Sequence, residues 1–116
     1  MATAEHGGEL ADIAGGLMIG VDPAVPRRVT TVKVPPGALL CFYTDGLVER
    51  REFPIDEGMA RLCRAVTAEA PDAACASVMG AMVRAGPVPD DIALLIFRRE
   101  PLAAGNLAAG NVAVGN

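Results

Sequence analysis

The sequence predicts one mixed α/β (α+β) domain with elements in the order β-β-α-α-β, and three observations support this fold class. Short runs rich in apolar and β-branched residues, typical of strands, occupy residues 29–34, 38–44 and 92–97. Between the second and third runs, apolar residues recur at helical spacing from residue 55 and again from residue 71. The chain has 116 residues, of which 52% are hydrophobic, so it can bury the modest core of one small domain.

The first two strand-like runs are separated only by Pro35-Pro36-Gly37, a typical turn sequence. So short a connection between two strands predicts an antiparallel hairpin. The third run, Ile92 to Phe97, is continuously apolar and is bounded by Asp90-Asp91 and Arg98-Arg99. Its shortness and its charged flanks predict a central strand that is buried on both faces.

Two amphipathic helices are predicted between these strands. The first helix begins at Ile55-Asp56-Glu57, with Asp56 as its N-cap. The second begins at Pro71-Asp72 and is stopped by Gly86-Pro87. The apolar faces expected to pack on the sheet are Met59, Leu62, Cys63 and Val66 in the first helix, and Ala74, Val78 and Met82 in the second.

Composition restricts the partners and the location of the chain. The net charge is −4, there are four aromatic side chains, and the basic residues form no stripe, so nucleic acid is not expected as a partner. No apolar run approaches the length of a membrane span, and residues 1–8 lack the layout of a signal peptide. The sequence therefore predicts a cytoplasmic protein without a membrane partner, whose three cysteines are reduced, buried thiols.

The chain divides into three parts by composition. Residues 1–14 are expected to be a poorly ordered N-terminal segment, and residues 15–99 carry the folded elements. Residues 100–116 contain a five-residue unit, x-Ala-x-Gly-Asn, three times in succession. Small-residue units at a chain end predict a flexible Ala/Gly/Asn tail rather than a solenoid.

Acidic residues meet strand ends at two places in the sequence. Asp45-Gly46 follows the second strand-like run, and Asp90-Asp91 precedes the third. Carboxylates fixed at neighbouring strand ends are suitable ligands for Mg²⁺ or Mn²⁺, which prefer oxygen donors. The local pattern alone also fits a simple turn at Asp45-Gly46 and an ordinary loop at Asp90-Asp91.

A longer series of motifs resembles the PPM-type protein phosphatases, in particular their bacterial sporulation-stage-II-E and stress-regulator branch. The two most specific blocks are Tyr-Thr-Asp-Gly-Leu-Val-Glu at residues 43–49 and Asp-Asp-Ile-Ala-Leu-Leu at residues 90–95. They occur in order with Gly-Val-Asp-Pro at 20–23, Pro-Pro-Gly at 35–37 and Ile-Asp-Glu-Gly-Met-Ala-Arg-Leu at 55–62. The resemblance covers about residues 15 to 99 and corresponds to the C-terminal half of the family domain only.

The resemblance implies a β-sandwich flanked by helices, here incomplete, with two Mn²⁺ or Mg²⁺ ions at one end. It implies hydrolysis of phosphoserine or phosphothreonine, with a phosphorylated regulatory protein of the anti-anti-sigma type as substrate. Asp45 and Asp90 match the family's metal-binding aspartates. Gly46, Glu49 and Asp91 are possible accessory positions.

The chain departs from the family pattern in its first part, where no counterpart of an early metal-bridging aspartate is visible, and His6 is not a convincing match to the family histidine. Two functions therefore stay open. One is a metal-dependent phosphatase, and the other is a non-catalytic remnant that acts as an interaction module. An incomplete sandwich exposes strand edges, which predicts possible self-association through them. A small-ligand domain is a third, weaker alternative, since no phosphate-cradling glycine motif is present.

Overall fold

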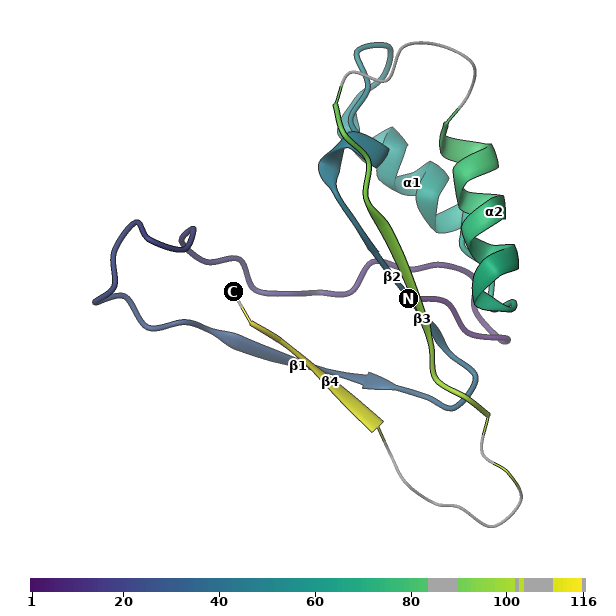
Figure 1. Ribbon diagram of the computed structural model, residues 1–116, viewed down its shortest axis with the longest axis horizontal. Helices are drawn as coiled ribbons and strands as arrows, with labels where there is room; N and C mark the ends of the chain where they lie inside the picture. The colour runs from purple at the N-terminus through teal and green to yellow at the C-terminus, as the bar shows by residue number, and fades with distance from the viewer. Residues whose placement is uncertain (84–89, 102, 104–109, 116) are drawn as a thin grey trace.

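The computed structural model describes residues 1–83, 90–101, 103 and 110–115. It confirms a mixed α+β domain whose first five elements follow the order β-β-α-α-β (Figure 1). The strands and helices are β1 (Val29–Val34), β2 (Leu39–Tyr43), α1 (Ile55–Ala65), α2 (Pro71–Met82), β3 (Leu94–Arg98) and β4 (Gly110–Gly115), with a single 3₁₀ turn, η1 (Asp45–Leu47), after β2.

The four strands form two separate antiparallel pairs, β2 with β3 and β1 with β4. The predicted hairpin between β1 and β2 is therefore wrong. Pro35 and Pro36 have no N–H to donate to a ladder, and Gly37 adopts a positive φ of 79° that turns the chain. The Gly37 N–H then donates to the Arg99 carbonyl (2.8 Å), and the Arg99 N–H donates to the Ala38 carbonyl (2.9 Å). After this turn, β2 therefore pairs with β3 instead of with β1.

Both helices cover the same face of the β2–β3 sheet (Figure 1). Alternate residues of the two strands point to this face, since Leu39 is fully buried and Cys41, Tyr43, Leu94 and Ile96 pack against the same core. The helices contribute the remaining buried side chains, which are Leu62 at α1 and Ala74, Val78 and Met82 at α2, together with Val66 just after α1. The predicted apolar faces of the helices are confirmed except at Cys63, which is half-buried and lines a cavity instead of packing in this core.

The opposite face of the β2–β3 sheet is open around Phe42 and Leu95, whereas Leu40 at its other end is buried with Val34, Ala38 and Met1. Phe42, Leu95 and Phe97 are 39%, 63% and 47% exposed, and Phe42 lies directly across from Leu95 in the register. Burial alternates along β3, which pairs with β2 alone among the described strands. The prediction that this strand is central and buried on both faces is therefore wrong, because Leu95 and Phe97 on its second face stay exposed in the described chain.

The helix starts differ in one respect from the sequence prediction. Helix α1 is preceded by Pro54 at the N-cap position, and no side chain caps it, so the assignment of Asp56 as N-cap is wrong. Asp56 and Glu57 lie in the first turn instead, where their charges complement the helix dipole. Helix α2 begins at Pro71 as predicted. Its predicted stop at Gly86-Pro87 lies outside the described residues.

The division of the chain into three parts stays a prediction, but the structure adds regular pairing at both ends. Ala2 forms an antiparallel bridge with Leu39, and β4 pairs along the whole of β1 from Val29–Gly115 to Val34–Gly110. The tail was expected to be flexible from its small residues. Strand β4 begins in the second unit, at Gly110, and contains the β-prone sequence Val-Ala-Val of the last unit.

In the described part of the chain, neither helix has the length and apolar content that a membrane span requires.

Candidate functional site

Asp45 stands where β2 ends and the chain turns. Its side-chain Oδ1 accepts a hydrogen bond from the Gly46 N–H (3.0 Å), and its carbonyl accepts from the N–H groups of Val48 (2.9 Å) and Glu49 (2.8 Å). These bonds close η1, whose Gly46 and Leu47 are buried while the Asp45 side chain is exposed. The turn therefore holds the Asp45 carboxylate at the end of the sheet, with one oxygen engaged by the backbone.

Thr44 ties this turn to the second acidic segment. Its hydroxyl accepts a hydrogen bond from the Ala93 N–H (2.9 Å) and donates to the Asp91 carbonyl (3.3 Å). The Thr44 N–H also donates to the Ala93 carbonyl (3.1 Å), which extends the β2–β3 ladder by one step. Segments nearly fifty residues apart in sequence are thus joined at one end of the strand pair.

Gly46 packs directly on the Asp90-Asp91 backbone. A Cβ atom at Gly46 would lie 2.4 Å from the Asp91 carbonyl oxygen and 3.2 Å from that of Asp90. Asp90 Oδ1 in turn accepts a hydrogen bond from the Asp91 N–H (2.8 Å), which repeats the arrangement at Asp45 and Gly46. The structure therefore brings together the two acidic segments singled out in the sequence. The ligand roles of Asp45 and Asp90, and the accessory roles of Gly46, Glu49 and Asp91, stay predictions.

A cavity of about 400 Å³ lies at this end of the sheet and is lined by Gly46, Glu49, Arg50, Arg51 and Asp90. The sequence assigned no role at this site to Thr44, Arg50 or Arg51. Their roles depend on tertiary contacts that leave no local signal. Thr44 lies inside the most specific motif block, residues 43–49, and Arg50 and Arg51 follow that block directly.

The donor set suits one hard cation better than two. Mg²⁺ and Mn²⁺ bind through one or two carboxylates and keep several waters, which two exposed aspartates at one strand end can satisfy. In residues 1–83, 90–101, 103 and 110–115, however, no three His, Cys, Asp or Glu side chains are grouped so that they could hold a metal ion. The described residues alone therefore do not make up the two-ion arrangement that the resemblance implied.

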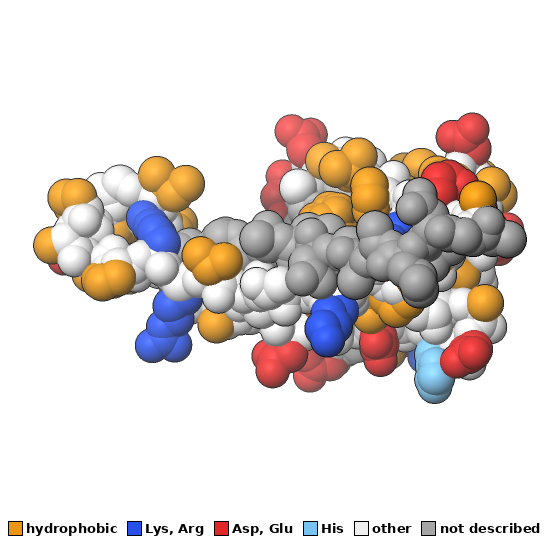
Figure 2. Space-filling view, turned by 90° about the horizontal axis from the view of Figure 1, so that it is seen from below, with side chains coloured by type: hydrophobic (Ala, Val, Ile, Leu, Met, Phe, Trp, Pro, Cys, Tyr) orange, Lys and Arg blue, Asp and Glu red, His pale blue; other side chains and the backbone are white. Residues whose placement is uncertain are grey.

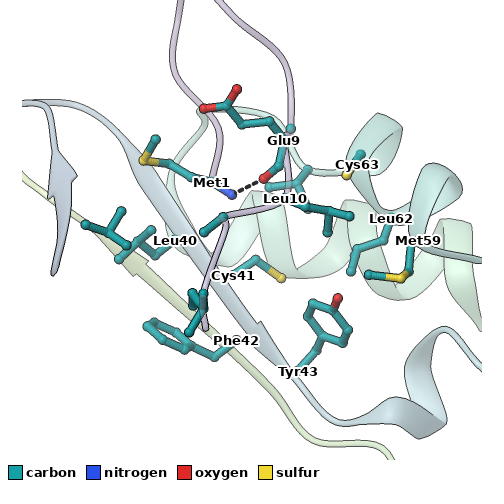
Figure 3. A pocket seen from close by; sticks show the side chains of 15 residues that line it. Met1, Glu9, Leu10, Leu40, Cys41, Phe42, Tyr43, Met59, Leu62 and Cys63 are labelled. Carbon is teal, nitrogen blue, oxygen red and sulfur yellow. Dashed lines mark hydrogen bonds between the residues drawn. The ribbon is translucent and has the colours of Figure 1, made fainter. Parts of the chain in front are cut away.

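A second cavity, of about 280 Å³, lies beside β2 on the side of the N-terminal segment and has a different character (Figure 3). Its lining is mostly apolar, and Cys41, Tyr43, Leu62 and Met59 are directed toward the same space. Burial raises the pKa of the Cys41 thiol and also that of the Tyr43 hydroxyl. A nucleophilic cysteine needs the opposite shift, so the chemistry of Cys41 argues against thiol-based catalysis in this cavity.

The fold and the site together define a small α+β domain that presents carboxylates at the end of its helix-covered strand pair. The family model of Stage II sporulation protein E (SpoIIE) matches residues 1–100, so the chain belongs to the SpoIIE family. This match confirms the resemblance drawn from the sequence. No curated protein and no solved structure matches the chain significantly.

Proposed function

We propose that this chain supplies Asp45 and Asp90 to the metal site of a Mn²⁺- or Mg²⁺-dependent protein serine/threonine phosphatase. The single observation that carries the proposal is the contact of the Asp45-Gly46 turn with the Asp90-Asp91 backbone in a member of the SpoIIE family, which is a family of metal-dependent phosphatases. The substrate we propose is a phosphorylated regulatory protein of the anti-anti-sigma type, met in the cytoplasm.

Asp45, Thr44 and Arg51 would each have a different role at this site. A bound divalent cation would activate water and neutralise charge on the phosphate oxygens. Asp45 would contribute the carboxylate oxygen that the Gly46 N–H leaves free, and Thr44 holds that turn against the segment that carries Asp90. Arg51 lines the same cavity, where its guanidinium would attract the phosphate group of the substrate.

The proposal requires further carboxylate ligands if two ions are to be held, because the described residues present only an incomplete set. A second polypeptide that supplies them would complete the site. In this view, the purified chain turns over substrate only when a second copy of it supplies the missing carboxylates.

The test is hydrolysis of p-nitrophenyl phosphate by the purified chain with Mn²⁺ and, separately, with a chelator. We expect Asp45→Asn to reduce Mn²⁺-dependent turnover to the level seen with chelator, because the amide oxygen is a much weaker ligand than the carboxylate. Asp12→Asn is the matched control, since Asp12 is exposed and does not line the cavity, and its turnover should be unchanged.

Two results would contradict the proposal. Equal turnover in Asp45→Asn and in the wild type would remove Asp45 from the site. If a folded wild-type sample shows no Mn²⁺-dependent turnover, with or without added partner protein, the non-catalytic alternative is favoured.

The second candidate function is an interaction module without catalysis, and the open sheet face favours it. Phe42, Leu95 and Phe97 present an apolar surface on the side of β2 and β3 that faces away from the helices. Apolar side chains also lie open beside acidic ones on the face of the molecule shown in Figure 2. Open apolar sheet surfaces of this kind promote association. We propose that the chain self-associates through this face and the adjoining strand edges, and that this association buries the apolar surface.

Leu95→Lys is expected to abolish concentration-dependent self-association, because it places a charge at the most exposed position of the open face. Sedimentation velocity across a hundredfold range of concentration measures the effect. Ile19→Lys is the control, since Ile19 is 93% exposed and lies outside the sheet. A wild-type chain that stays monomeric over the whole range would rule out this form of self-association.

A further inference from the structure

Arg50 connects two parts of the molecule that end at the acidic site. Its guanidinium Nη1 donates to the Gly46 carbonyl (3.1 Å), and its Nη2 donates to the Met82 carbonyl (3.1 Å). Gly46 belongs to the turn that carries Asp45, and Met82 is the last residue of α2. The side chain is half-buried and also lines the cavity at the site.

The chemistry of both contacts favours an arginine. The last carbonyl groups of a helix have no partner within the helix, and the helix dipole makes them attractive to a cation. The planar guanidinium presents several N–H donors in a fixed fork, so one side chain can satisfy two carbonyls in a defined direction. Hydrogen bonds from a charged donor are stronger than those between neutral groups.

The position of the two contacts gives Arg50 a specific effect. One bond fixes the turn behind Asp45, and the other fixes the end of α2, the element that precedes Asp90 in the chain. We propose that Arg50 is a positioning residue that holds the Asp45 turn at a fixed place relative to α2 and to the Asp90 segment. The expected effect of Arg50 on metal binding rests on the proposed function. Its expected effect on the position of the Asp45 turn does not.

The experiment compares Arg50→Gln with wild type in two measurements on the full chain. The first is Mn²⁺ affinity, followed by the loss of the free-Mn²⁺ electron paramagnetic resonance signal. We expect affinity to fall about tenfold or more, as is usual when a residue that orients a metal ligand is removed. The second is amide hydrogen exchange in residues 44–48, which we expect to become faster because the turn loses one of its anchors.

Two further variants separate positioning from charge. Arg64→Gln removes an arginine charge from an exposed position of α1 that does not line the cavity, so both measurements should match wild type. Arg50→Lys keeps the charge, but its ammonium lacks the fork that reaches both carbonyls, so it should restore the two properties only in part.

The outcomes distinguish this inference from the proposed function. If Arg50→Gln lowers the melting temperature while the Mn²⁺ affinity of the folded protein and the exchange of residues 44–48 stay at wild-type values, Arg50 is merely structural and the inference is overturned. If the wild type binds no Mn²⁺, the proposed function fails, and hydrogen exchange alone then decides. Faster exchange in Arg50→Gln but not in Arg64→Gln supports the positioning role, and equal exchange in all variants rejects it.

Discussion

Gly58→Ala is expected to destabilise the domain by about 2 to 3 kcal/mol, although the same change in most helices is stabilising. Gly58 is buried in α1, and a Cβ atom there would lie only 2.0 Å from the Val48 carbonyl oxygen. The obstacle is backbone, which cannot rotate away as a side chain can. The helix must therefore shift away from Val48, and the packing of Leu62 in the core shifts with it. Such a loss is a large part of the stability of so small a domain.

Urea denaturation followed by circular dichroism measures this effect, and α2 provides the matched control. Gly80 is also a helix glycine, but a Cβ atom there would meet nothing within 4 Å. Gly80→Ala should therefore raise the free energy of unfolding by up to about 1 kcal/mol. A Gly58→Ala variant as stable as Gly80→Ala would show that α1 does not pack on Val48 as described.

Gly46→Ala is expected to separate the two acidic segments and to abolish Mn²⁺ binding at them. The added methyl group would lie 2.4 Å from the Asp91 carbonyl oxygen, so the Asp45 turn and the Asp90-Asp91 backbone must move apart. We expect a loss of stability of about 2 kcal/mol from this clash. Calorimetric titration with Mn²⁺ and thermal unfolding of the same samples measure the two effects.

Gly7→Ala is the control for this second prediction, because a Cβ atom at Gly7 would meet nothing within 4 Å. It should leave both Mn²⁺ binding and unfolding unchanged. Wild-type Mn²⁺ affinity in a folded Gly46→Ala variant would contradict the close packing of the two acidic segments as the basis of the site.

Local sequence patterns predicted β1, β2, β3 and both helices, but not β4, because the first five depend on periodicity and on turn residues that act within a few positions. The buried face of α2, with Ala74, Val78 and Met82, follows directly from helical spacing. The sequence also predicted the two acidic strand ends, since glycine and aspartate next to an apolar run indicate that a strand ends there. The structure adds that Thr44 and Gly46 bring them together.

Pairing and burial could not be predicted in the same way, because they depend on residues far apart in sequence. The rule that a short connection makes a hairpin failed at Pro35-Pro36-Gly37, where the partner of β2 proved to be β3. The continuous apolar run in β3 predicted that both faces of the strand are buried. A sequence pattern shows which side chains are apolar, but not whether another element packs on them. The role of Arg50 was invisible for a similar reason, since Met82 is thirty-two residues away.

Because both faces of β3 are apolar, the hydrophobic pattern alone does not fix the register of β3 against β2. A slip of one residue against β2 would turn Leu95 and Phe97 toward the helices and Leu94 and Ile96 outward. Burial alone distinguishes these two arrangements poorly, because the exchanged side chains are all large and apolar. The choice must come from the two ends of the strand, where Thr44 binds Ala93 and Asp91, and where Arg99 binds Gly37 and Ala38. The contacts that assemble the acidic site thus also select one alignment of the sheet, and the chain cannot misalign this strand without also dismantling the site.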